Sequence, residues 1–192
     1  QGKFILSKFT NNSFNGANDD ELYLASTCTT LPTIPGVAFA RRTFCGIYFN
    51  GGGASFAALS VPLNSANNVF KDMQAGIVGI DGAVNIRNCR FENIQQLSGN
   101  TAAYQATAIT FLDNVGGKRL NVVGLGMNGT STVHHTERGI YALTSKAMTQ
   151  VGVQGCRMTE IQNGVALDEG AQGMMGNFSL VNITDNYLDC SY

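Results

Sequence analysis

Two aspartates at the ends of equivalent segments are the best candidates in this chain for a pair of catalytic or metal-binding carboxylates. Aligning five glycine- or alanine-led apolar segments places four residues in one column, with Asp168 beside it: Asp81, Asp113, Thr144 and Glu169. If Asp81 and Asp113 belong to adjacent strands, their carboxylates would lie about 5 Å apart. Such a pair can do acid–base work on a glycosidic bond or share Ca²⁺. The alternative is that both acids end a strand in a solvated turn.

The only two histidines lie in a polar cluster with an arginine. The run at 134–138 contains His134, His135 and Arg138, and it is expected in a long connection that precedes an apolar segment beginning at Gly139. A histidine beside charged groups can transfer protons or bind an acidic sugar. Side chains of adjacent residues on an extended segment point to opposite faces, so at most one histidine is expected in a given site. The alternative is a polar surface loop.

Two tyrosines are candidates for carbohydrate binding. Tyr48 and Tyr141 take equivalent, outward-facing places in their segments, with Val78, Thr110 and Ala166 in the same column. Tyrosine on a flat sheet offers a sugar both a ring face and a hydroxyl group. Scattered surface tyrosines are also ordinary, so this hypothesis has a plain alternative.

Metal and disulfide chemistry find little support in the sequence. No cysteine or histidine spacing suggests zinc, and the acidic run at 18–21 lacks the ligand spacing of a calcium loop. We therefore predict no metal site and no cofactor, and Ca²⁺ is the only ion whose binding is left open. The five cysteines do not form an even disulfide framework. Cys28 with Cys45 is the only pair worth considering.

A repeat organises these candidates along the chain. Residues 84–94, 151–161 and 181–188 share a pattern of apolar, x, apolar, then two small or polar residues, x and apolar. Weaker copies occur at 9–14, 37–44, 63–70 and 120–127, and the copies are 21 to 36 residues apart. Alternation of period two predicts a strand with one buried face, and the polar pair predicts a corner. A second strand follows most corners, and all but the one that begins at Ala108 begin with a glycine, which we expect to supply a turn conformation.

Stacked copies should form ladders of equivalent side chains. The corner column is Asn11, Arg41, Asn67, Asn88, Gly124, Gly155 and Asp185. The next column contains Asn12, Arg42, Asn68, Cys89, Leu125, Cys156 and Asn186, in which asparagine is expected to bond bent backbone and cysteine to fill space without that bond. The interior ladder is expected to contain Phe14, Phe44, Phe70, Phe91, Met127, Met158 and Leu188.

The predicted fold is all-β: a right-handed parallel β-helix solenoid of about seven coils. A single coil leaves its apolar face exposed, and stacking of the coils buries that face in one continuous core. Residues 1–192 form a single segment. The last copy stops just after its corner, so we expect the chain to be part of a longer one, with adjoining coils or another chain at that end.

The repeat resembles those of the pectin-lyase-like superfamily, with an asparagine ladder and a pattern "I-x-x-N/C-x-F" followed by "G-I-x-L". The resemblance covers the chain from about residue 5 onward, and it implies the fold more strongly than an activity. The family's hydrolases share an Asp-Asp pair, a Gly-His-Gly and an Arg-x-Lys. Only Asp19-Asp20 is similar to these, so the resemblance implies no hydrolase site here.

Composition limits the function further. The net charge is −1, charged residues make up 13% and the longest basic run is Arg41-Arg42, which gives nucleic-acid binding little support. No apolar run is long enough to span a membrane. We expect the chain to be a segment of an extracellular or cell-surface protein with a structural or adhesive role. Absence of catalysis is a stronger expectation than an enzymatic activity. Polysaccharide or cell-surface glycan is the expected partner. The alternatives are a polysaccharide lyase or glycoside hydrolase, and a phage tailspike segment in which three rods pack side by side.

Overall fold

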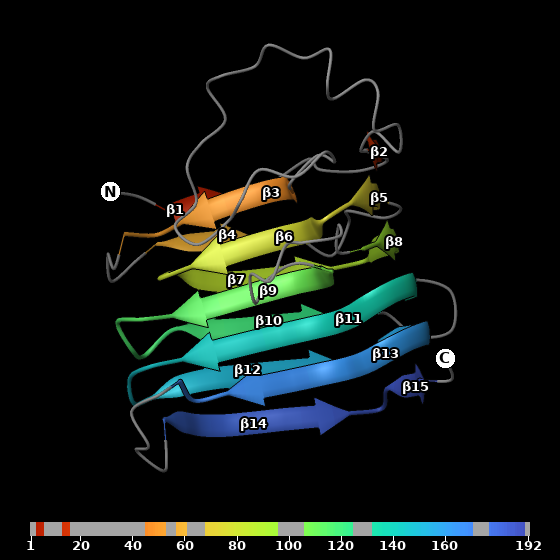
Figure 1. Cartoon of the computed structure of the whole chain (residues 1–192). Coiled ribbons are helices and arrows are strands. Elements are labelled where there is room, and N and C mark those ends of the chain that lie inside the picture. Colours follow the sequence, from red (N-terminus) through yellow and green to blue (C-terminus); the bar gives the residue numbers. More distant parts are fainter. Residues whose placement is uncertain are drawn as a thin grey trace.

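The computed structural model describes residues 3–5, 13–15, 45–52, 57–60, 68–95, 106–124, 132–170 and 177–190. These residues form fifteen β-strands and no helix, so the all-β prediction is confirmed for this part of the chain. Every strand pairing is parallel (Figure 1). In these described ranges no helix is long and apolar enough to cross a membrane.

The first sheet has six strands, in the order β1 (Lys3–Ile5), β4 (Ala58–Ser60), β7 (Ala83–Arg87), β10 (Arg119–Val123), β12 (Thr149–Gln154) and β14 (Phe178–Thr184). Alternation of apolar and polar residues fixes which face is buried. Val84 and Ile86 of β7 are fully buried, whereas Asn85 between them is partly exposed. The same alternation recurs in β10 and β12, so their apolar side chains form a common interior.

The second sheet contains β2 (Ser13–Asn15), β5 (Asn68–Met73), β8 (Cys89–Ile94), β11 (Thr132–Thr144), β9 (Thr107–Asp113), β6 (Ala75–Ile80) and β3 (Cys45–Asn50) in that order. Two further strands, β13 (Arg157–Asp168) and β15 (Tyr187–Asp189), continue from β11. The first part of β11 pairs with β8 and its second part with β9, so one long strand joins both halves of this sheet.

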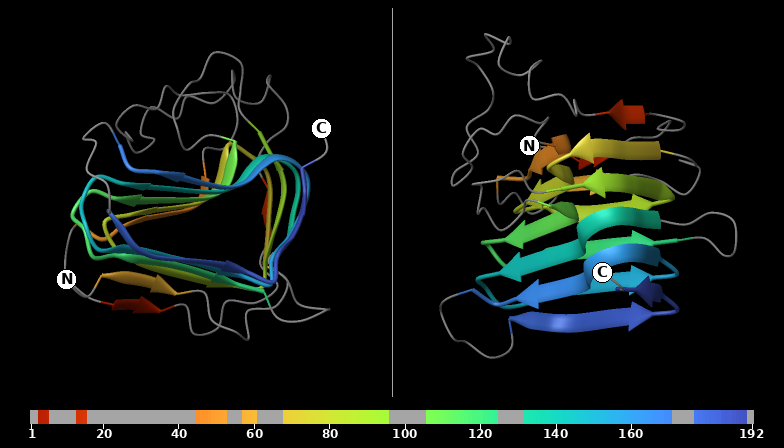
Figure 2. Two further views of the ribbon diagram at one scale, coloured as in Figure 1. Left: turned by 90° about the horizontal axis from the view of Figure 1, so that it is seen from below. Right: turned by 45° about the vertical axis from the view of Figure 1, so that its right-hand side comes forward.

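The strands of the two sheets follow one another along the chain in a repeating order. It runs through β5, β6 and β7, then through β8, β9 and β10, and each later strand pairs in parallel with its counterpart. The strands lie one above another from β1 to β14 (Figure 1), and seen from below they superpose around a common interior (Figure 2). This arrangement is compatible with a parallel β-helix.

The interior ladder differs from the prediction at two places. The register joins Phe14, Phe70, Phe91, Val133, Met158 and Leu188. Val133 therefore takes the place expected for Met127, because Val133 is the residue that the register pairs with Phe91. Phe14 pairs directly with Phe70, which leaves no rung for Phe44. Met127 and Phe44 themselves lie outside the described residues. The Phe70 and Phe91 rings stack with centroids 5.0 Å apart.

The predicted corner column is confirmed at three of its four described positions, and the exception is Gly124, which has no positive φ. Asn88, Gly155 and Asp185 all have positive φ, between 56° and 64°, which lets the chain bend sharply between strands. In the next column, Asn186 accepts a hydrogen bond from the Cys156 amide (2.8 Å) and donates one to the Val153 carbonyl (3.0 Å), as expected for a corner asparagine. Cys89 and Cys156 are not inert fillers, since each thiol donates to the carbonyl two residues earlier at 3.6 Å.

The glycines that begin the second strands have a different role from the predicted one. Gly76 and Gly139 lack a positive φ, so turn conformation is not the reason for glycine. A Cβ on Gly76 would lie 2.5 Å from both the Phe91 ring and the Ala108 carbonyl, and one on Gly139 would lie 2.6 Å from the Met158 sulfur. Glycine is needed because the large ladder side chains press against this backbone.

Candidate functional site: the histidine face

Asp113 is fully buried at the end of β9 and holds a turn together. Its carboxylate accepts hydrogen bonds from the amides of Val115 (3.3 Å), Gly116 (2.7 Å) and Lys118 (2.9 Å) and from the Thr149 hydroxyl (2.6 Å). Both oxygens are thus engaged by protein donors. This arrangement satisfies the backbone of the turn and leaves no lone pair directed at solvent.

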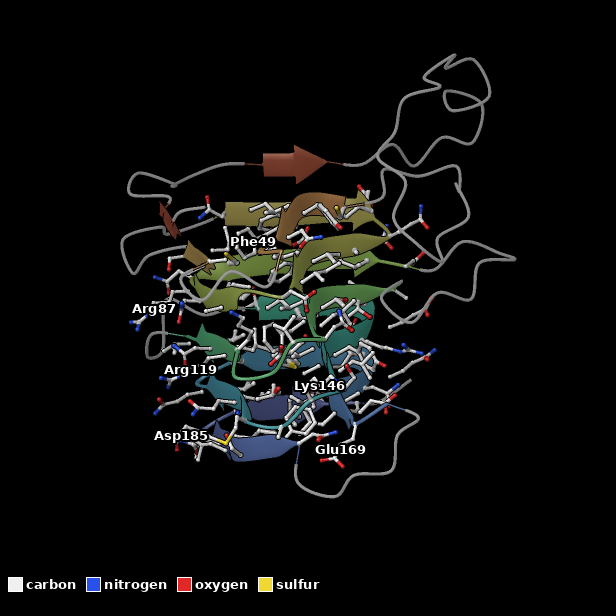
Figure 3. The ribbon with its side chains drawn as sticks, turned by 90° about the vertical axis from the view of Figure 1, so that its left-hand side faces the viewer. Phe49, Arg87, Arg119, Lys146, Glu169 and Asp185 are labelled. Carbon is white, nitrogen blue, oxygen red and sulfur yellow. The ribbon has the colours of Figure 1, made fainter. Side chains whose placement is uncertain are left out.

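Asp81 takes the neighbouring place but makes no pair with Asp113. Its carboxylate accepts a hydrogen bond of 2.7 Å from the Asn114 amide, and its own amide bonds the Leu112 carbonyl at 2.9 Å. Asp113 in turn pairs with Thr144, so the predicted column is present. Glu169 and Lys146 lie on the turns that follow β13 and β11 (Figure 3). The column stabilises turns, and the structure offers no geometry for two cooperating carboxylates at Asp81 and Asp113.

The histidines lie within strand β11 and not in a loop. His135 has a φ of 48°, and the register aligns it with three other residues of positive φ: Asp72, Asn93 and Glu160. This bend column turns each strand where the two halves of the second sheet meet. A left-handed residue interrupts the alternation of side chains, so the expectation that the two histidines face opposite sides is wrong. Their ring centroids are 6.5 Å apart, and neither ring is buried.

Side chains of the bend column pair along the stack. Asn93 donates a hydrogen bond of 2.5 Å to Asp72, and the His135 Nδ1 lies 2.5 Å from a Glu160 carboxylate oxygen. The His135 and Glu160 side chains are 67% and 54% exposed. An exposed histidine–carboxylate pair can bind a polar ligand or exchange a proton with one.

Outward residues beside the bend form a second polar column. The register aligns Lys71, Glu92, His134 and Thr159, and His134 bonds the Thr159 hydroxyl. Glu92 makes ion pairs with Lys71, at 3.8 Å, and with Arg90. Partial burial and the Arg90 charge lower the pKa of His134 from its ordinary value of 6.5, with smaller lowering by His135 and Arg157, while Glu92 opposes them.

A third column was not predicted from the sequence. It contains Arg90, Thr132, Arg157 and Tyr187, and the Arg157 guanidinium lies 5.0 Å from the centre of the Tyr187 ring. These outward side chains alternate with the interior ladder Phe91, Val133, Met158 and Leu188. The alternation at 157–159 and 187–189 was visible in the sequence. What was missing was the register that brings Arg90 into the same column. We call the second and third columns, with the His135–Glu160 pair, the histidine face.

Arg138 does not join the histidines. It follows the bend and pairs with Thr107 and Asn163 in the other half of the sheet. Its charge lowers the pKa of Tyr141, whereas it has no resolved effect on His134. The predicted cluster at 134–138 is therefore split by the bend at His135.

The two candidate tyrosines share a column as predicted but differ in exposure. Tyr48 is 38% exposed, whereas Tyr141 is 8% exposed and packs with Leu112 in a second apolar cluster. The Tyr141 hydroxyl donates a hydrogen bond of 3.1 Å to Asp168. Burial and the Asp168 carboxylate together raise the pKa of Tyr141 to about 12. Tyr141 is thus wrong as an exposed sugar platform, because its ring and hydroxyl are both engaged within the chain.

The remaining candidates add no second site. Among the described residues no group of three or more His, Cys, Asp or Glu side chains is placed to hold a metal ion. Burial raises the pKa of Cys45, Cys89 and Cys156 to about 12, so these thiols are poor nucleophiles. The acidic run at 18–21 and Cys28 lie outside the described residues. No family model, curated protein or solved structure matches this chain.

Proposed function

We propose that this chain is a right-handed β-helix solenoid of an extracellular or cell-surface protein, with a structural or adhesive role, and that the histidine face binds a glycan. The fixed order of strand sets and the wholly parallel pairing support the solenoid. The number of coils and a relationship to the pectin-lyase-like superfamily remain predictions.

One observation carries the glycan-binding proposal. Arg90, Thr132, Arg157 and Tyr187 form a column of outward side chains on adjacent strands, about 4.8 Å apart. Arginine binds carboxylate or sulfate oxygens in a bidentate manner, and an aromatic ring stacks on a sugar. Three of these side chains, those of Arg90, Arg157 and Tyr187, are exposed. A chain of acidic sugars lying across the strands would meet them in turn.

Titration calorimetry with acidic and neutral oligosaccharides tests this proposal. We expect the acidic series to bind and Arg157→Gln or Tyr187→Ala to weaken binding by roughly tenfold, which corresponds to about 1.4 kcal/mol. Arg119→Gln is the matched control, because Arg119 is also an exposed arginine and lies on β10 of the first sheet. Absence of glycan binding, or equal weakening by Arg119→Gln, would contradict the proposal.

The enzyme alternative has one supporting feature, the exposed His135–Glu160 pair. A lyase or hydrolase acting there would release new chain ends from a bound polysaccharide. Incubation of the acidic series with the protein, followed by a reducing-end assay, separates the two functions. Cleavage that His135→Gln abolishes would favour the enzyme, and binding without cleavage favours the adhesive role.

The tailspike alternative is favoured by a separate observation. Leu112 and Tyr141, with the partly exposed Ile80, Leu143 and Ala166, form an apolar cluster on the outer side of the second sheet. Side-by-side packing of three rods would bury the partly exposed members of this cluster. Sedimentation equilibrium at a mass of three chains would support this alternative.

A further inference from the structure

The interior ladders end in exposed apolar side chains at one end of the stack. In the first sheet, Val151 of β12 is 1% exposed, whereas Val181, its partner on β14, is 43% exposed. Val153 is fully buried and its partner Ile183 is 41% exposed. These pairs have the same orientation toward the interior, so the difference arises because no strand lies beyond β14 among the described residues.

The second sheet ends in the same way. Met158 is 1% exposed and its partner Leu188 is 46% exposed. Ala142 is fully buried and its partner Leu167 is 38% exposed. Val181, Ile183, Leu188 and Leu167 are thus the exposed last members of these columns, on β14, β15 and β13, the strands at the bottom of Figure 1, and we call this end of the stack the lower edge.

The lower edge also presents unpaired backbone. Within the described ranges β14 pairs only with β12, and β15 pairs only with β13. Alternate amides and carbonyls of an edge strand point away from its single neighbour, and they accept a further strand. An apolar surface with free strand hydrogen bonds fits a β-strand partner better than it fits a small molecule or a flat protein surface.

The opposite end of the same ladders supplies strands that match. In the first sheet Phe4 of β1 pairs with Leu59, whose column continues through Val84, Leu120 and Val151 to Val181. In the second sheet Phe14 of β2 begins the column that ends at Leu188. Phe49 of β3 begins the column that ends at Leu167. A second copy placed below the first would thus continue three columns in parallel register, and each continuing position is a phenylalanine in the sequence.

We propose that the lower edge binds a second copy of this chain head to tail, with β1 and β2 of that copy pairing with β14 and β15. The proposal does not depend on glycan binding. The contact is heterologous, because different surfaces of the two copies meet. It therefore leaves a free lower edge on the second copy and produces an open-ended series of species.

Small-angle scattering over a concentration series tests the geometry without any substitution. We expect the scattering mass and the length of the particle to rise together while its cross-sectional radius stays constant. Growth of the cross-section, or a plateau at three chains, would instead show side-by-side packing and overturn the proposal. A particle of one chain at every concentration would overturn it as well.

Two single-end variants then test the pairing. Val181→Lys blocks the lower edge and Phe4→Lys blocks the upper one, so each variant alone should sediment as a single chain. An equimolar mixture should form a species of exactly two chains that does not grow, because one free edge of each kind remains. Association of either variant alone, or no association in the mixture, would contradict the head-to-tail contact.

Val115→Lys is the matched control, since Val115 is 47% exposed on the turn after β9 and away from the lower edge. It should associate as the unaltered chain does. Circular dichroism and urea unfolding establish that each variant is folded. If Phe4→Lys fails to fold, Ile183→Lys mixed with the unaltered chain replaces it: the variant should cap growing chains and lower their mean length.

Discussion

Two arginines act on His134 although the chain as a whole is almost neutral. Arg90, His135 and Arg157 lie near enough to act with burial in lowering its pKa, and Glu92 only partly opposes them. The Glu160 carboxylate pairs with His135 in the neighbouring bend column and not with His134. Neutral His134 is therefore the form that the folded chain favours near neutral pH.

This shift predicts how stability depends on pH. Because the folded pKa lies below 6.5, the unfolded chain takes up the proton at a higher pH than the folded chain does. The contribution of His134 is complete above pH 6.5 and is lost as the pH falls through the folded pKa. Urea unfolding at pH 7.5 and 5 should show a loss at the lower pH that His134→Gln reduces. An unchanged pH dependence in that variant would show that other groups cause the loss.

Asp113 predicts a second effect at the scale of single residues. In Asp113→Asn one carboxylate oxygen becomes an NH₂ group, which cannot accept from the Lys118 amide and the Thr149 hydroxyl. Two buried donors lose a charged partner, so we expect a loss of about 2 to 3 kcal/mol in the free energy of unfolding. Asp81→Asn is the control. It keeps an acceptor for the Asn114 amide, and asparagine tolerates the positive φ at this position. Similar losses in both variants would contradict a special role for Asp113.

At the scale of elements, β7, β8 and β12 could be predicted because they repeat one local pattern. Period-two alternation followed by a polar corner locates each strand and its buried face. The corner residues Asn88, Gly155 and Asp185 are types that tolerate left-handed backbone, and all three have it. The column of Tyr48, Val78, Thr110, Tyr141 and Ala166 was also predicted correctly.

The bend column was beyond sequence analysis for a physical reason. Aspartate, asparagine and histidine are enriched at positive φ, but glutamate is not, and the four positions of the column have four different residue types, so no shared type marks it. The sequence separation of Phe91 from its partner Val133 also exceeds the usual repeat, because 12 residues lie between β8 and β9 and 8 lie between β10 and β11. The histidine face depends on both features, and pattern matching alone therefore placed the histidines in a loop.

Strand packing predicts opposite effects for two glycines. Gly76→Ala places a Cβ 2.5 Å from the Phe91 ring and from the Ala108 carbonyl, and backbone cannot move as easily as a side chain. We expect a loss of about 2 kcal/mol or more from this overpacking. On Gly152 of β12 the nearest atom is the end of the Asn121 side chain at 3.1 Å, so Gly152→Ala should be near neutral or slightly stabilising. Chemical denaturation of both variants checks the comparison, and equal losses would contradict it.

At the scale of the whole molecule, stability should fall from the middle of the stack toward the lower edge. Each strand of the stack contacts mainly its two neighbours, so the free energy of opening is approximately a sum of adjacent contacts. β12 has neighbours on both sides, β10 and β14, whereas β14 has only β12 among the described residues. The exposed Val181 and Ile183 add little burial to hold that last strand.

Amide hydrogen exchange measures this gradient directly and connects it with head-to-tail association. In dilute solution the β14 amides should exchange through local opening at least about tenfold faster than those of β10 and β12, which corresponds to about 1.4 kcal/mol. At high concentration a second copy would pair with β14 and protect it, while β10 and β12 would change little. Val181→Lys should keep β14 fast at every concentration. Equal protection of β14 and β12 in dilute solution would contradict this gradient. It would mean that pairing with β12 alone keeps β14 closed, so that protection of this edge does not require a second copy.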